Sequence, residues 1–279
     1  MLKLIVNADD FGMSEVVNNK ILQSFKHGIL RSASLMANGN SFDHAVKIIE
    51  SNPELDVGLH ITLSGEKPVS KAEEIDSLVN SAGGFHSDSN KFALKYFLRK
   101  ISINDVRKEI DAQFQKAFDH GIKITHIDSH QHLHLLPSIF DTVLEFANKF
   151  NIQFVRCPNE QLRLNMLSNF FSSKRLFQLT AVKMGCWIVK NRVYGCADHF
   201  FGFYHGGFLT TKNILALLQN LPLEGVCELM CHPGKETCST KEKKTYRIVE
   251  EADTLIDDKV IKFLAYRNVE ITSFRSLSY

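Results

Sequence analysis

Short apolar runs alternate with amphipathic segments along almost the whole chain, and this alternation limits the possible folds more than any other feature. Apolar runs short enough for strands occur at Leu2–Asp9, Ala33–Asn38, Val57–Leu63, Ile124–His134, Gln153–Arg156, Asp198–Tyr204, Val226–Met230 and Glu270–Phe274. Helical periodicity predicts helices at 14–28, Phe42–Ser51, Asn104–His120, Ser138–Phe150, Lys174–Lys190, Thr211–Leu221 and Lys241–Arg267. Strands that alternate with helices lie parallel. About eight such units predict an α/β fold with one irregular (β/α) barrel, TIM-like and closed or nearly closed.

The length of 279 residues would allow two domains of ordinary size, but barrels of 200–250 or more residues fold as one domain. No linker rich in Pro, Gly or Ser divides the chain. We therefore expect residues 1–279 to form a single domain. Two segments exceed a minimal barrel, at 64–103 and 158–191. Both leave the carboxyl ends of predicted strands, where the active-site loops of barrels grow.

Charge and composition exclude several classes of protein. Apolar residues make up 44% of the chain, which excludes a disordered chain, and the net charge of +2 argues against nucleic acid as a partner. No apolar run is long enough to span a membrane, and the N-terminus does not resemble a secretory signal. Six cysteines without a CxxC pair indicate free thiols in a reducing compartment. We expect a cytoplasmic protein.

Polar residues gather at the carboxyl ends of four predicted strands. The clusters are Asn7–Gly12, Gly58–Thr62, Thr125–His134 and Glu228–Gly234. Side chains alternate along a strand, so we expect His126, Asp128, His130, His132 and His134 to point to one face. Imidazole is a common metal ligand, and we expect one or two of these histidines to bind a metal. The others would orient ligands or contact the substrate. The alternative is a face of solvated or hydrogen-bonded histidines.

The carboxylate pair Asp9-Asp10 can divide two tasks. One carboxylate can bind a metal while the other takes a proton from water; the alternative is an acidic pair placed against a helix dipole. One carboxylate and two histidines with an open position suit a divalent ion that activates water. His232 comes from a distant strand and could protonate a leaving group, or it could cap a turn. Arg156 could contact a polar substrate or form a structural salt bridge.

Together these motifs resemble those of the YdjC-like carbohydrate deacetylases, a family that includes chitooligosaccharide deacetylases. The motifs are Asn-Ala-Asp-Asp-Phe-Gly at 7–12, Gly-Leu-His at 58–60, His-Ile-Asp-Ser-His-Gln-His-Leu-His at 126–134 and Met-Cys-His-Pro-Gly at 230–234. The resemblance implies an irregular barrel related to the polysaccharide deacetylases. It implies metal ligands at Asp10, His60 and His130, a catalytic base at Asp9, a late site histidine at His232 and an orienting role for Asp128.

The resemblance implies magnesium as the metal, whereas an Asp-His-His set suits zinc or another transition metal at least as well. The predicted activity is metal-dependent removal of an N-acetyl group from an amino sugar or a short N-acetylated oligosaccharide, with release of acetate. The first alternative is an amidohydrolase or phosphoesterase that acts on a non-sugar substrate. The second is a sugar-binding protein without catalysis. Phe170, Phe171 and Trp187 could form a homodimer interface or belong to the core.

Overall fold

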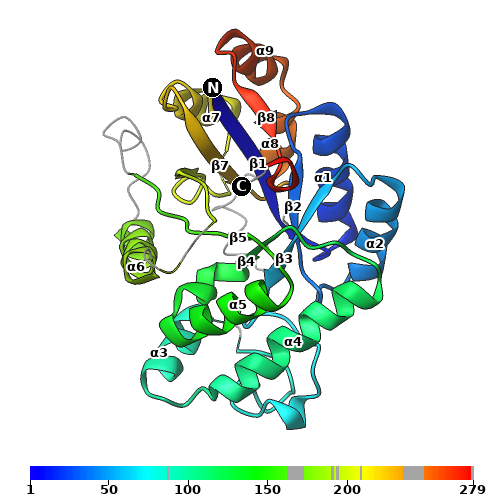
Figure 1. The fold of residues 1–279 in the computed structure, drawn as a ribbon, viewed down its shortest axis with the longest axis vertical. Helices are drawn as coiled ribbons and strands as arrows, with labels where there is room; N and C mark the ends of the chain where they lie inside the picture. The colour runs from blue at the N-terminus through cyan, green and yellow to red at the C-terminus, as the bar shows by residue number, and fades with distance from the viewer. Residues whose placement is uncertain are drawn as a thin grey trace.

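The computed structural model describes residues 1–86, 88–161, 173–189, 192, 195–207, 209–234 and 248–277. In these ranges the strands form one parallel sheet in the order β5-β4-β3-β2-β1-β7-β6, and β8 also pairs with β1 (Figure 1). The strands are β1 (Leu2–Phe11), β2 (Ser32–Leu35), β3 (Asp56–Ile61), β4 (His126–Ser129), β5 (Phe154–Val155), β6 (His199–Phe201), β7 (Gly225–Cys231) and β8 (Glu270–Thr272). The predicted α/β class is confirmed.

Helices connect the strands and pack on one another around the sheet, α1 against α2 and α8, α4 against α5, and α7 against α9. They are α1 (Glu15–His27), α2 (Phe42–Ser51), α3 (Ser89–Phe97), α4 (Ile103–Asp119), α5 (Pro137–Lys149), α6 (Ser173–Val189), α7 (Thr211–Leu218), α8 (Ile248–Leu255) and α9 (Asp258–Tyr266). Ser14, the first residue of the range predicted for this helix, caps α1, since its Oγ accepts a hydrogen bond from the Val17 N–H. Within the described ranges, none of these helices is both long and apolar enough to cross a membrane.

The sheet curls into a partly closed barrel. Among the described residues β5 and β6 are not paired with each other. The Val155 N–H donates instead to the carbonyl oxygen of Gly195, which precedes β6. The structure is therefore a curled half-barrel of parallel strands, and the carboxyl ends of those strands converge on one side.

The chain after β8 fills the inside of this curl at the amino ends of the strands. One edge of β1 pairs with β7 from Leu2 to Ala8, so β8 and β2 share the other edge. After β8, the ring of Phe274 stacks on His126 at a centroid distance of 4.0 Å. A Cβ atom at Gly58 would lie only 2.3 Å from Nε2 of His126, so glycine there leaves room for the imidazole.

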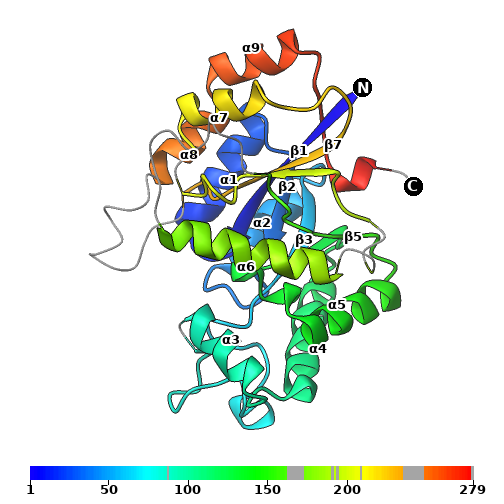
Figure 2. The same ribbon diagram turned by 90° about the vertical axis from the view of Figure 1, so that its left-hand side faces the viewer.

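The segment at 64–103 leaves the carboxyl end of β3, and its Ile75, Leu78 and Phe92 belong to the main hydrophobic core. It contains the 3₁₀ turn η1 (Ala72–Glu74) and helix α3, and Figure 2 shows it at the opposite end of the molecule from α7, α8 and α9. The buried carboxylate of Glu109 in α4 holds it by accepting hydrogen bonds from the N–H groups of Val69 and Ser70, both 2.9 Å. The predicted 158–191 insertion contains α6, on which Trp187 is exposed. Residues 162–172, which include Phe170 and Phe171, lie outside the described residues.

Several predicted strands are shorter in the structure, and two predicted elements are divided. The strand expected over Ile124–His134 ends at Ser129, and the 3₁₀ segment η2 (His130–Leu135) follows. Gln131 and His132 have φ values of 59° and 56°, and Ser129 Oγ closes the turn by accepting the His134 N–H. The five polar side chains therefore do not share one face. In the helix expected over Lys241–Arg267, the described part consists of α8 and α9, separated where Asp257 caps α9.

Candidate metal centre and active site

A bulge at the end of β1 brings both carboxylates of the Asp9-Asp10 pair into the site. The register pairs Ala8 with Ala33 and then Phe11 with Leu35, so β1 contains one residue more than β2 over this stretch. Asp10 takes a φ of 65°, in the left-handed region. In a regular strand the two side chains would point to opposite faces. The bulge leaves both carboxylates inside the curl and almost completely buried.

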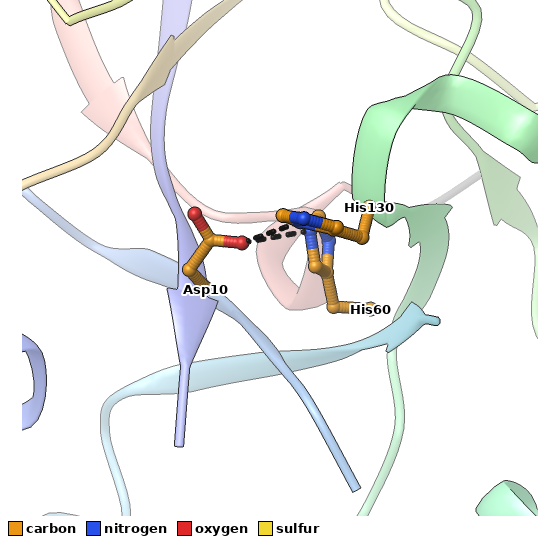
Figure 3. A group of neighbouring side chains, drawn as sticks. All are labelled: Asp10, His60 and His130. Atoms are coloured by element: carbon orange, nitrogen blue, oxygen red, sulfur yellow. Dashed lines mark hydrogen bonds and ion pairs between the residues drawn. The ribbon is translucent and has the colours of Figure 1, made fainter. Parts of the chain in front are cut away.

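Asp10, His60 and His130 converge at the carboxyl ends of the strands (Figure 3). Oδ1 of Asp10 lies 2.8 Å from Nδ1 of His130 and 3.4 Å from Nε2 of His60. The three ligand atoms all lie within 4.8 Å of one another. The residues come from β1, β3 and the start of η2, so three distant parts of the sequence build one donor set. Its composition, one carboxylate and two imidazoles, fits zinc or another transition ion better than magnesium, which prefers oxygen.

Asp128 orients the imidazole of His60. Oδ1 of Asp128 lies 2.7 Å from Nδ1 of His60, so Nδ1 carries the proton and Nε2 faces Asp10. Burial opposes the charged imidazolium, but the carboxylates of Asp128, Asp10 and Asp9 outweigh it and raise the pKa of His60 to about 10. Burial likewise opposes ionisation of Asp128, but Arg156 and His60 hold the pKa of that carboxyl well below its ordinary value. The buried carboxylates around His60 therefore favour a positive charge within this cluster, which suits a cation.

Arg156 lies buried among three carboxylates. Its two terminal nitrogens bind the two oxygens of Asp9, both at 2.8 Å, Nη1 also pairs with Asp128, and Nε donates to Glu228 at 2.6 Å. Of its two interpretations, a substrate contact or a salt bridge, the structure places Arg156 in the salt bridges. A second potential metal group, Asp9, His60 and Asp128, includes two of these carboxylates. The guanidinium beside them repels a cation there, so we favour the set with Asp10 and His130.

Asp9 and His232 lie beside the donor set. His232 follows β7 directly, and its Nε2 lies 4.0 Å from Oδ2 of Asp9. The side chain of His232 is 16% exposed, whereas that of Asp9 is 4% exposed. The structure thus brings together the two residues predicted to transfer protons, with the imidazole on the more accessible side.

The remaining histidines of the 126–134 stretch do different work. Burial lowers the pKa of both His126 and His134 to about 4, so both are neutral. Nε2 of His134 lies 2.9 Å from the carbonyl oxygen of Arg156 and fixes that strand end. His132 is half-buried, with its ring 5.3 Å from that of Phe203. Only His130 of this stretch belongs to the donor set in which we place the cation.

Several buried polar residues of the site received no role from the sequence. Asn7 Nδ2 donates to Asp9 Oδ1 at 3.1 Å, and Ser34 Oγ donates to Asp128 Oδ2 at 2.8 Å. Strand alternation could have found Asn7, because it lies two residues before Asp9 on the same face. Burial raises the pKa of Glu228 to about 7, although Arg156 opposes this shift. Within the described chain, neither potential metal group contains a cysteine.

Known proteins resemble this chain over nearly its whole length. The family model for YdjC-like proteins matches residues 3–266. A carbohydrate deacetylase of Thermoanaerobacter pseudethanolicus is 32% identical over 279 residues, which cover 99% of this chain and 100% of the relative. A carbohydrate deacetylase of Geobacillus stearothermophilus is 32% identical over 97% of this chain and 96% of the relative. A solved structure from Enterococcus faecalis V583, provisionally described as a cellobiose-phosphate cleavage protein, has a TM-score of 0.75 and 25% identity over 99% of both chains. This chain belongs to the YdjC-like family.

Proposed function

We propose that this protein is a deacetylase that uses one divalent metal ion to hydrolyse the N-acetyl group of an amino sugar or a short N-acetylated oligosaccharide. The observation that carries the proposal is the convergence of Asp10, His60 and His130 beside Asp9 and His232. Relatives that match over nearly the whole chain are named carbohydrate deacetylases, which supports a sugar as the substrate.

The side chains divide the work of hydrolysis. A divalent ion held by Asp10, His60 and His130 would lower the pKa of water and polarise the acetyl carbonyl group. Asp9 accepts a proton as the water oxygen bonds to the carbonyl carbon. Arg156 holds the Asp9 carboxylate in place through two hydrogen bonds. His232 donates a proton to the nitrogen as the C–N bond breaks, which releases acetate and the free amine.

The test separates metal binding from proton transfer. Purified protein is loaded in turn with Zn²⁺, Mn²⁺ or Mg²⁺, and acetate release is measured from N-acetylglucosamine and from di-N-acetylchitobiose with and without a phosphate group. We expect Asp10→Asn to lose both metal and activity, whereas Asp9→Asn keeps the metal and loses activity. Asp43→Asn, on the exposed surface of α2, serves as the control and retains both.

Each rival activity has its own outcome in this experiment. A protein that binds metal and hydrolyses a non-sugar amide or a phosphate ester, but releases no acetate from these sugars, is an amidohydrolase or a phosphoesterase. A protein that binds the sugars without turnover is a sugar-binding protein. Full activity of Asp9→Asn would remove Asp9 from the role of base.

A further inference from the structure

Glu251 is a completely buried carboxylate in α8, outside the group of residues assigned to the chemistry. A buried carboxylate is costly unless hydrogen-bond donors surround it. The hydrogen-bond donors around Glu251 should therefore explain why a carboxylate lies there. In the sequence it lies in a helical stretch, 19 residues after His232, with no motif around it.

The carboxylate of Glu251 joins the end of β7 to the segment just before α7. Oε2 accepts a hydrogen bond from the backbone N–H of His232 at 2.7 Å, and Oε1 accepts one from the N–H of Leu209 at 3.2 Å. His232 directly follows β7, and Leu209 lies in the connection between β6 and α7. One side chain from α8 thus fixes the backbone in two segments, one of which carries His232.

The backbone of His232 is held on its other side as well. Sγ of Cys231 donates to the carbonyl oxygen of Asn7 at 3.3 Å, which ties the end of β7 to β1 two residues before Asp9. Beyond Cys231 the strand ends, and the ladder with β1 no longer positions the chain. The hydrogen bond that the His232 N–H donates to Glu251 replaces the ladder at this residue, whose side chain faces Asp9 at 4.0 Å.

We propose that Glu251 is a positioning residue for His232, which it holds at the distance from Asp9 that proton donation to the leaving amine requires. The proposal rests on the proposed function, in which His232 is the general acid. Without the carboxylate, the N–H of His232 loses a charge-assisted hydrogen bond, and the imidazole is no longer held in one place relative to Asp9.

The test compares an amide with an ester in the metal-loaded protein. Hydrolysis of di-N-acetylchitobiose needs a proton on the departing nitrogen, whereas 4-nitrophenyl acetate releases a phenolate that needs none. We expect Glu251→Gln to lower kcat for the amide on the order of tenfold, the loss expected for one hydrogen bond to a charged group. The ester rate, the metal content and KM for the amide should change little. His232→Ala should show the same selectivity with a larger loss.

Glu109→Gln is the matched control, because Glu109 is also a fully buried carboxylate that accepts two backbone N–H groups. It should lose comparable stability without a change in the ratio of amide to ester rates. Equal loss of both rates in Glu251→Gln, or a ratio no different from that of Glu109→Gln, would overturn the proposal. If the wild-type protein with bound metal releases no acetate from the sugar, the proposed function fails instead.

A structural measurement tests the positioning role without any assay of activity. In a crystal structure of Glu251→Ala we expect the imidazole of His232 to be displaced from its place 4.0 Å from Asp9, or to occupy several positions. An imidazole that keeps this place in the variant would contradict the proposal, whatever the fate of the catalytic function.

Discussion

Nδ1 of His60 lies 2.7 Å from Oδ1 of Asp128, while Nε2 of the same ring faces Oδ1 of Asp10 at 3.4 Å. The carboxylate of Asp128 therefore fixes both the tautomer and the direction of the ring. Its second oxygen accepts the hydroxyl of Ser34 and pairs with Arg156, so Asp128 itself cannot rotate freely. This relationship links the candidate metal site to the buried charges around Arg156.

We expect Asp128→Asn to weaken metal binding by about 10–100-fold, because His60 loses the partner that holds its ring. Metal affinity can be measured by competition with a chromogenic chelator. Asp56→Asn is a suitable control, since Asp56 is equally buried but binds Ser32 and Arg275 at the other end of the strands. An unchanged affinity in Asp128→Asn would show that His60 keeps its orientation by packing alone.

Replacing Arg156 with Met should cost about 3–5 kcal/mol of unfolding free energy, because carboxylates buried around it lose their counter-charge. The reference is Arg107→Met, which removes the partner of Glu145 on the surface and should cost about 0–1 kcal/mol. Urea denaturation of both variants provides the comparison. Similar losses in the two variants would mean that the network around Arg156 contributes no more than a surface pair.

Glu228 should make the stability of the metal-free protein depend on pH. Burial, opposed by Arg156, raises the pKa of Glu228 from 4.5 to about 7 in the folded protein. Between these values the folded state keeps a proton that the unfolded state has lost, so stability falls as pH rises. Glu228 thus contributes about 3 kcal/mol to the free energy of unfolding. This contribution is fully present below pH 4.5 and lost above about pH 7.

The variant Glu228→Gln lacks this titration. The unfolding free energy of the variant minus that of the wild-type protein should therefore rise by about 3 kcal/mol between pH 4.5 and about pH 7. Below and above this interval the difference should not change with pH. Urea denaturation after removal of metal, at several pH values from 4 to about 8, measures the difference. A difference that is independent of pH would show that Glu228 titrates as it does in the unfolded chain.

Gly58→Ala should destabilise the protein by about 1–3 kcal/mol through overpacking. The new methyl group would lie 2.3 Å from the ring of His126, which cannot retreat because Phe274 stacks on it. At Gly84 the nearest atoms to such a methyl group are 3.9 Å away, so Gly84→Ala should be close to neutral. Thermal unfolding of the two variants distinguishes them, and equal midpoints would contradict the steric argument.

The sequence predicted the parallel sheet and the approximate place of most strands and helices, because the periodicity of apolar residues reflects burial directly. It also predicted that the clusters around 9–10, 60, 126–134 and 232 meet, since the carboxyl ends of parallel strands lie on one side of a sheet. The choice of Asp10, His60 and His130 within these clusters rested on the resemblance to the family. It missed Glu251, because the carboxylate binds backbone N–H groups of distant segments. Nearly every residue has a backbone N–H group, so the sequence around Glu251 contains no pattern that indicates this contact.

The sequence by itself determined the fold class and the chemical inventory of the site: two adjacent aspartates, histidines near the carboxyl ends of three strands and an arginine near the end of another. Only the tertiary structure decided which atoms face one another. The bulge at Asp10 and the turn at His130–Leu135 contain left-handed backbone conformations, at Asp10 and at Gln131 and His132. Strand alternation therefore predicted the wrong faces only over 126–134, where the left-handed turn after Ser129 overrides local periodicity.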